Sequence, residues 1–200
     1  FLILLFALIS VTRAVTFNCS FQMISSINLP WTYTCYTEAL SSITSSERLT
    51  AVHGTHMTGK TLDDVEFLFI NNVPSLTFFP KVITDFFPNL IALQISICNI
   101  SAIHENELDV FTNLRWFAFT QHPQFIRIPG NLFANTPFMH SVSFDRNRLI
   151  HVGANLLTSL SQLTFANFES NHCVNRYART ASEIPSLIEQ LRTNCTDIET

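Results

Sequence analysis

The sequence predicts a fold of the α/β class, a solenoid with a curved parallel β-sheet on its concave side and loops with short helices on its convex side. Two observations predict it. An apolar pattern returns at a nearly constant spacing between residues 65 and 165, and two cysteines precede this region while two follow it. Each returning unit would add one strand to a parallel stack, and such a stack needs a cap over each end.

The clearest copy of the pattern is LIALQISICNI, residues 90–100, in which apolar residues stand at positions 90, 93, 95 and 100. Cys98 takes a position that often carries Asn, so this copy matches the L-x-x-L-x-L-x-x-N/C-x-L signature of a leucine-rich repeat. The five copies begin at positions 65, 90, 114, 139 and 160, which lie 25, 24, 25 and 21 residues apart. We therefore predict a leucine-rich repeat solenoid of about five repeats over residues 61–166, with one short convex helix at 104–111. Its strands are predicted at 66–70, 92–96, 116–120, 141–145 and 162–166.

The first eleven residues, FLILLFALISV, form one apolar run. At ~1.5 Å per residue this run is too short for the ~30 Å hydrocarbon core of a bilayer. It has the length of the apolar region of a signal peptide, and Ala14 is a small residue suited to cleavage. We therefore interpret residues 1–14 as a signal peptide of a secreted protein; the alternative is a buried N-terminal strand or helix.

The regions on either side of the repeats are predicted to be caps, at residues 15–60 and 167–200. β-Rich stretches at 15–19 and 31–36 flank a turn signal, which predicts a hairpin pinned by a Cys19–Cys35 disulfide. Near the other end, the apolar residues of 184–191 share one helical face, so a Cys173–Cys195 disulfide would clamp a helix over the last strand. Spacing alone permits other pairings.

The fifth cysteine, Cys98, has two interpretations. Its inward position in the repeat favours a small buried thiol, whereas an unpaired cysteine in a secreted chain can also form an intermolecular disulfide. Three N-x-S/T sequons, at Asn18, Asn99 and Asn194, predict glycosylation. None of them falls on the concave strands, so glycans would leave that face open.

The sequence contains no G-x-S-x-G, H-E-x-x-H, Walker loop or C-x-x-C motif. His53 and His56 are three residues apart, but their stretch reads as a strand, in which such residues face opposite ways, so we interpret them as surface histidines. The net charge is −4 and no basic run exists, which argues against nucleic acid and anionic membranes as partners. We therefore predict a protein that is not an enzyme and has no cofactor or metal site.

The outward-pointing strand residues form the candidate binding surface, on the concave face. Trp and Arg are enriched in binding hot spots, so Trp116 with Arg115 is the first candidate. The predicted ligand-binding residues are Phe67, Phe69, Ile91, Gln94, Arg115, Trp116, His140 and Asp145. In the alternative interpretation, Phe67 and Phe69 pack under the N-terminal cap, and Trp116 lies against a neighbouring side chain.

The chain resembles small secreted leucine-rich repeat proteins of the type common in insects, in the stretches 62–65, 87–90, 150–157 and 171–175. The resemblance implies a non-enzymatic extracellular protein with a role in recognition, adhesion or immunity. The chain departs from the family in its C-terminal cap, which has two cysteines where many relatives have four. It also departs at the position usually held by asparagine, where we place Cys98, His122, Asn147 and Phe168.

These observations predict a secreted glycoprotein that binds an extracellular protein partner through its concave face. One alternative is innate immune recognition of microbial surface molecules, in which the polar concave residues would matter more. Another is a structural extracellular protein that forms a homodimer through the same face. After removal of the signal peptide, no insertion into a membrane is expected.

Overall fold

The computed structural model describes residues 15–26, 29–40 and 48–195. The predicted signal peptide at residues 1–14 lies outside the described residues. Within the described part of the chain, no helix is long and apolar enough to cross a bilayer.

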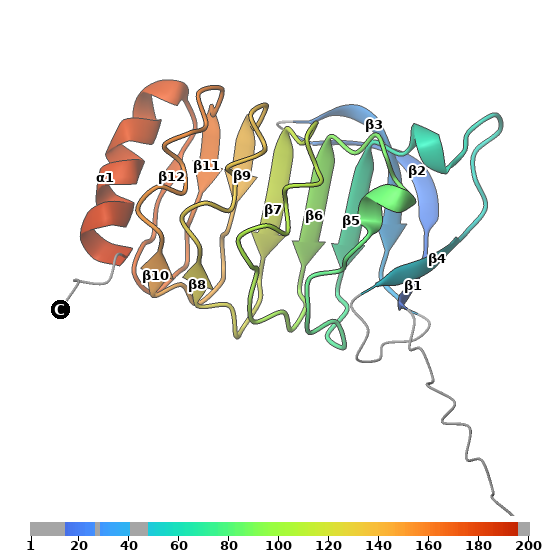
Figure 1. Cartoon of the computed structure of the whole chain (residues 1–200), viewed down its shortest axis with the longest axis horizontal. Coiled ribbons are helices and arrows are strands. Elements are labelled where there is room, and N and C mark those ends of the chain that lie inside the picture. The colour runs from blue at the N-terminus through green and yellow to red at the C-terminus, as the bar shows by residue number, and fades with distance from the viewer. Residues whose placement is uncertain (1–14, 27–28, 41–47, 196–200) are drawn as a thin grey trace, which may run out of the picture.

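Eight strands form the main sheet, which runs along the long axis of the molecule (Figure 1). In chain order they are β2 (Ser20–Ser26), β3 (Leu29–Thr37), β5 (Phe67–Asn71), β6 (Ala92–Ser96), β7 (Trp116–Thr120), β9 (Ser141–Ser143), β11 (Phe165–Asn167) and β12 (Tyr177–Ala178). Within this sheet, neighbouring parallel strands follow one another in chain order: β3, β5, β6, β7, β9 and β11. The two edge strands, β2 and β12, are antiparallel to their neighbours. Two short parallel pairs lie beside this sheet: β1 (Val15–Asn18) with β4 (Leu49–His53), and β8 (Arg127–Ile128) with β10 (His151–Val152).

Alternate residues of each parallel strand point into one continuous core. Leu68, Leu93, Phe117 and Val142 are in register across the sheet, and all four are fully buried. The core lies between the sheet and the returns, by which we mean the segments that carry the chain from the end of one parallel strand to the start of the next. Since the side chains of a strand alternate between two faces, the other half of the strand residues lie on the opposite side, which we call the open face.

A residue with a left-handed backbone follows each parallel strand from β5 to β11. These residues are Asn72, Ile97, Gln121, Arg146 and Ser170, with φ between 54° and 61°. The first four donate their backbone N–H to a carbonyl oxygen of the neighbouring strand segment, for example Ile97 to Thr120 at 3.1 Å. A left-handed residue reverses the chain into the return, although it is sterically costly for a β-branched side chain such as that of Ile97.

The predicted α/β leucine-rich repeat solenoid is wrong as a fold class. The structure is mostly β, its eight-stranded sheet is mixed, and the described residues contain one α-helix, α1 (Ile184–Cys195), near the end of the chain. The other helical segments are the short 3-10 turns η1 (Leu62–Asp64), η2 (Ile83–Asp85) and η3 (Ala181–Glu183). The leucine-rich pattern therefore located parallel strands, but the class that we inferred from it does not describe the molecule.

The expected convex helix at 104–111 is absent, and this segment forms consecutive turns instead. Its hydrogen bonds join residues three apart, as from Phe111 N–H to the Leu108 carbonyl at 3.0 Å. Eight residues are too few to offset the cost of nucleating an α-helix without strong packing. In the next return, Pro123, Pro129 and Pro137 interrupt any helical pattern.

The sequence analysis chose the wrong stretch as the first strand of the N-terminal hairpin. The strand that pairs with β3 is β2, while the stretch expected to pair with it, β1, lies parallel to β4. The Cys19–Cys35 disulfide is confirmed; it ties the residue between β1 and β2 to β3. This disulfide therefore joins the short β1–β4 pair to the main sheet.

The last predicted strand was out of register. The repeat pattern that starts at Leu160 predicts that Leu160, Leu163 and Phe165 face inward. Both leucines are buried in the core, but Phe165 lies opposite Ser141 on the open face, and β11 presents Ala166 to the core. Strand side chains alternate, so an odd shift in register exchanges the two faces. The last unit starts at Leu163 and not at Leu160, and the position equivalent to Phe117 and Val142 is held by the small Ala166.

The C-terminal helix and its disulfide agree with the sequence analysis. Helix α1 buries Ile184, Leu187 and Leu191 against the end of the core, and Cys195 at its last turn is bonded to Cys173. Figure 1 shows α1 at the opposite end of the molecule from β1 and β4. The preceding turn starts with a capping box between Thr180 and Glu183.

Candidate functional site

The open face has an aromatic half, which we define as Phe67, Phe69 and Ala92. Phe67 and Phe69 stack with their ring centroids 5.7 Å apart, and Ala92 is next to Phe67 in the sheet register. Leu29 of β3 and Ile24 of β2 pack on this cluster, so Phe67 is only 2% exposed and Ala92 is fully buried. The β2–β3 hairpin thus covers the aromatic half.

Further along the open face the side chains are small. We call Ala118, Ser141 and Ser143 the small-residue half. These side chains lie on β7 and β9, between larger neighbours. Ser141 stands in one row between Trp116 and Phe165, and its buried hydroxyl has no hydrogen-bond partner among the described residues. Such an unsatisfied buried group is uncommon in folded proteins.

Polar side chains on this face are linked to one another. Gln94 Nε2 donates to Ser96 Oγ at 2.8 Å, and Ser96 Oγ shares a hydrogen bond of 2.9 Å with Thr120 Oγ1. Ser143 Oγ donates to Asp145 Oδ1 at 2.7 Å. These bonds fix the positions of Gln94 and Asp145, both of which remain partly accessible.

The edge of the sheet where β6, β7 and β9 begin holds a pocket of about 380 Å³, which we call the rim pocket. It is lined by Asn89, Ile91, Asn113, Arg115 and Phe138. The backbone of this edge is tightly connected: Arg115 N–H donates to the Ile91 carbonyl, and His140 N–H donates to the Arg115 carbonyl, each at 2.8 Å. Neighbouring repeats therefore bring the Arg115 guanidinium and the apolar side chains of Ile91 and Phe138 to the same pocket.

Exposure separates the members of this rim. Arg115 is exposed and Phe138 is 46% exposed, which is unusual for a phenylalanine in a chain with so large a core. His140 is also exposed, and its Nδ1 donates to the Phe138 carbonyl oxygen at 2.6 Å. Trp116 is half-buried because its ring packs edge-on against Phe67, with centroids 5.4 Å apart.

The structure sorts the eight predicted ligand-binding residues into three groups. Phe67 and Phe69 belong to the covered aromatic half, in line with the alternative interpretation of these two residues. Ile91 and Arg115 line the rim pocket, beside Trp116 and His140. Gln94 and Asp145 are anchored polar residues of the open face.

The sequence analysis missed Phe138, Asn89 and Asn113. All three stand two residues before a position that we did select, namely 91, 115 or 140. Their spacing of 24 and 25 residues was therefore visible in the sequence. They were overlooked because they lie three residues before the strands, whereas the candidates at 91, 115 and 140 lie directly before the first strand residue.

The buried polar side chains after the strands serve the core. Asn147 Nδ2 donates to the carbonyls of Phe119 and Phe144, and Asn171, not Phe168, takes the corresponding position one unit later. His122 lies between the carbonyls of Ile95 and Cys98, with its ring stacked 3.7 Å from that of Phe119. Burial lowers the pKa of His122 to about 4, although the two carbonyl contacts act in the opposite direction.

Cys98 is buried and is not part of a disulfide. Its thiol donates to the Ser96 carbonyl at 3.4 Å, and burial raises its pKa to about 11, so it stays a neutral thiol at physiological pH. The interpretation as a small buried thiol therefore fits the structure. A reactive or intermolecular role does not fit a side chain that is 1% exposed.

The two histidines considered as metal ligands, His53 and His56, lie in different environments. His53 is exposed, whereas His56 stacks on Phe21 and shares a 2.9 Å hydrogen bond with the Tyr33 hydroxyl. Among the described residues, no group of three or more His, Cys, Asp or Glu side chains is arranged to hold a metal ion.

The three sequon asparagines lie away from the open-face strands. Asn18 is exposed at the end of β1, and Asn194 is exposed in α1, near the opposite end of the molecule (Figure 1). Asn99 lies on a return, where its Nδ2 donates to the Pro74 carbonyl at 2.7 Å. Glycosylation of these residues stays a prediction.

Comparison with known proteins gives a likeness in fold. No protein-family model matches the chain, and no curated protein matches its sequence. Among solved structures, the chain is similar to one chain of "Structure of the Toll - Spatzle complex, a molecular hub in Drosophila development and innate immunity", with a TM-score of 0.50 and 14% sequence identity. The match covers 62% of this chain and 17% of that chain, so it concerns the fold of one segment and no more. The resemblance to a secreted insect family stays a prediction.

Proposed function

We propose that this protein is a secreted, non-enzymatic binding protein that recognises an extracellular protein partner through the rim pocket and the adjoining open face. The observation that carries the proposal is the rim pocket itself, where Arg115, Ile91 and Phe138 surround a hollow of about 380 Å³.

The residue types of this surface suit protein recognition. Aromatic residues and arginine are enriched in binding hot spots, because they offer a large apolar area together with charge-assisted hydrogen bonds. Phe138 and Arg115 are exposed, and the neighbouring Trp116 is held by its edge-on contact with Phe67. Side chains that are already positioned lose less conformational entropy when a partner binds.

The polar residues of the open face would supply specificity. Gln94 and Asp145 are fixed by hydrogen bonds to Ser96 and Ser143, and both side chains remain partly accessible. A partner that offers donors and acceptors at these positions would satisfy them, whereas a purely apolar partner would bury them at a cost.

Two observations support the extracellular setting. The Cys19–Cys35 and Cys173–Cys195 disulfides belong to oxidising compartments, and the sequons suit a chain that passes through the secretory pathway. The apolar run at the start of the sequence supports the same setting.

The experiment is an affinity capture from the extracellular fluid of the organism that makes the protein, with residues 15–200 as bait. A Phe138→Asp/Arg115→Glu variant tests the rim pocket. The matched control is Ile150→Asp/Arg148→Glu, because Ile150 is 46% exposed like Phe138, Arg148 is exposed, and neither lines the rim pocket.

We expect a partner that the wild type and the control retain and that the rim variant loses, with affinity reduced by about tenfold or more. Equal capture by all three proteins would contradict a binding site at the rim. Retention of microbial surface molecules instead of a host protein would favour immune recognition. A second copy of the chain as the captured species would favour the homodimer.

A further inference from the structure

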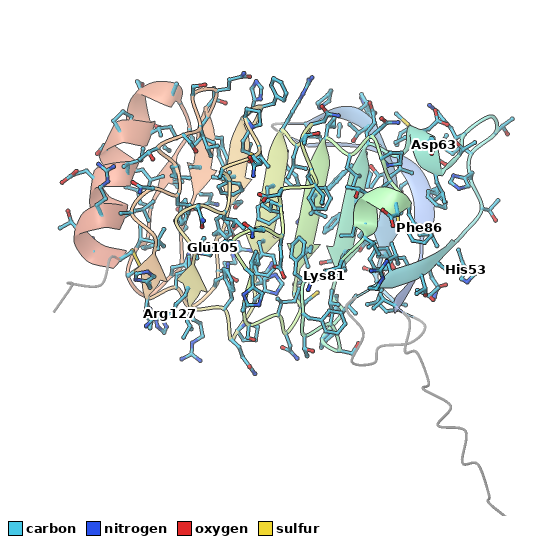
Figure 2. All side chains as sticks on the ribbon, viewed as in Figure 1. His53, Asp63, Lys81, Phe86, Glu105 and Arg127 are labelled. Atoms are coloured by element: carbon cyan, nitrogen blue, oxygen red, sulfur yellow. A yellow bond between two sulfur atoms is a disulfide. The ribbon has the colours of Figure 1, made fainter. Side chains whose placement is uncertain are left out.

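The opposite side of the molecule carries a larger groove, between the return that follows β5 and the return that follows β6. It has a volume of about 680 Å³ and is formed by residues 79–85, 103–107, 110–111 and 129. We call it the return groove. Figure 2 shows Lys81 and Glu105 on the returns, in front of the strands, so this groove and the open face lie on different sides of the sheet.

The floor of the return groove is apolar. Phe79, Ile83, Ile103 and Phe111 line it, and each is at most 4% exposed because the rest of its side chain packs in the core. Val110 stands at the groove with 57% of its surface exposed. An apolar body placed in this groove would therefore cover mainly Val110, together with the small area of the floor that is still exposed.

The polar groups of the groove are predominantly acidic. Asp85, Glu105 and Glu107 contribute three carboxylates and Lys81 contributes one ammonium group, so the lining has a formal charge of −3 + 1 = −2 with His104 neutral. Asp85 belongs to one return together with Lys81, and Glu105 and Glu107 belong to the other. Carboxylates therefore stand on two sides of the apolar floor, and the net charge of −2 comes from the second return.

Two of these carboxylates are held in place. Glu105 Oε2 accepts a hydrogen bond from Asn131 Nδ2 at 2.9 Å, and Glu107 Oε2 accepts the backbone N–H of His104 at 3.0 Å. The wall on the other side is held by the η2 turn, in which the Asp85 N–H donates to the Val82 carbonyl at 3.2 Å and the Phe87 N–H donates to the Ile83 carbonyl at 3.0 Å. The groove is thus a preformed shape with acidic edges.

We propose that the return groove binds a small organic cation with an apolar body. Its volume lies within the ~300–1,000 Å³ typical of small-molecule sites, which combine an apolar lining with a few placed polar groups. The apolar body would lie on the floor between Ile83 and Ile103, and the cationic group would lie between Asp85 and Glu105. The charge of the lining favours a cation over an anion of the same size.

The test is a fluorescence titration of residues 15–200 with dansylcadaverine, a primary amine with a naphthalene body. The matched probe is 6-(dansylamino)hexanoic acid, which has the same fluorophore on a chain that ends in a carboxylate. We expect saturable binding of the amine, at least about tenfold tighter than that of the acid, because only the amine is attracted by the acidic lining. A preference that disappears in high salt would agree with this cause.

Two variants locate the bound probe. Asp85→Lys/Glu105→Lys should weaken amine binding by at least about tenfold, since it reverses the charge on both sides of the groove. Its matched control is Asp63→Lys/Glu189→Lys, which makes the same change in net charge at exposed residues outside the groove (Figure 2 labels Asp63). Val110→Trp should fill the mouth and abolish binding, whereas the nearly isosteric Val110→Thr should retain it.

The proposal is overturned if the amine does not bind saturably, if amine and acid bind equally, or if the groove variants bind the amine as well as their controls do. The Phe138→Asp/Arg115→Glu variant should bind the amine like the wild type. Loss of amine binding in that variant alone would place the site at the rim pocket and would also contradict the proposal.

Discussion

The aromatic half and the small-residue half of the open face occupy the same strand positions, yet they belong to different environments. Phe67 on β5 and Ser141 on β9 stand in one row of the sheet, and Ala92 on β6 and Trp116 on β7 lie between them. Phe67 is covered by Ile24 and Leu29 of the hairpin, whereas Ser141 has a hydroxyl without a partner. Both side chains are 2% exposed, so the end with Phe67 behaves as a second apolar core, whereas the end with Ser141 buries a polar group that has no hydrogen-bond partner among the described residues.

This difference shows that strand register decides which side of the sheet a side chain takes but not what packs against it there. The cover over Phe67 comes from residues about forty positions earlier in the chain, in β2 and β3. The rim pocket lies where the covered half ends, since Ile91 and Trp116 also touch the Phe67 cluster. The covered half thus acts as a platform for the exposed residues beside it.

The largest expected effect is on the covered half. Phe67→Ala should lower the free energy of unfolding by ~3–5 kcal/mol, because it leaves a cavity under the hairpin. Gln94→Ala, at a half-buried position on the same face, should lower it by only about 1 kcal/mol, the net value of its hydrogen bond to Ser96. Urea unfolding followed by circular dichroism measures both values. Similar losses for the two variants would remove the distinction between covered and accessible positions.

The second prediction concerns His122, which follows β7, the strand that adjoins both halves. Its pKa is lowered to about 4 in the folded protein, so between pH 6.5 and 4 the unfolded chain binds more protons. Stability from this group should therefore be complete above pH 6.5 and should fall by about 3 kcal/mol as the pH drops to 4. Urea midpoints at pH 7.5, 6, 5 and 4 measure the decline.

The His122→Asn variant isolates this contribution from that of the carboxylates. Asparagine can donate two hydrogen bonds to the carbonyls, as Asn147 does, but it does not titrate. The variant should lose the extra decline between pH 6.5 and 4 while keeping the part that the carboxylates cause. An identical pH dependence in both proteins would show that His122 carries no lowered pKa.

The third prediction separates the ends of the molecule. A Cys19→Ser/Cys35→Ser variant should lose about 3 kcal/mol, the value expected for closing a loop of this length. Hydrogen exchange should then increase mainly in β2, β3 and the aromatic half, whereas α1 should stay protected by the Cys173–Cys195 disulfide. Uniform loss of protection would mean that the two ends are not independent.

The smallest effect is expected in the small-residue half. Ser141→Ala removes a buried hydroxyl that has no hydrogen-bond partner in the described residues, so it should leave stability unchanged or raise it by up to ~1 kcal/mol. Thermal unfolding measures this change. A loss of more than ~1 kcal/mol would show that the hydroxyl is satisfied in solution, for example by water.

Parts of the fold could be read from the sequence because they depend on local patterns. The periods around Leu93 and Phe117 placed β6 and β7 at their observed bounds, and the cysteine positions led to both disulfides. The predicted α/β fold class was wrong because we expected helices in the returns, which form turns instead. The register of β11 was missed because a small core residue, Ala166, gives a weak apolar signal.

The candidate site was only partly predictable for a similar reason. Arg115 and Ile91 were found because their residue types and phase in the repeat point outward. The burial of Phe67 could not be read from β5, since it depends on a hairpin distant in sequence. Phe138 was missed because it lies before its strand, and the rim is created only when neighbouring units align.

The most direct test of the proposed binding surface is site-specific photo-crosslinking in extracellular fluid. Benzoylphenylalanine would replace Phe138 in one protein and Ile150 in another, since both native residues are 46% exposed and only Phe138 lines the rim pocket. We expect one discrete crosslinked partner from position 138 and none from position 150. Crosslinking to the same partner from position 150 alone, or equally from both positions, would contradict recognition at the rim of the open face.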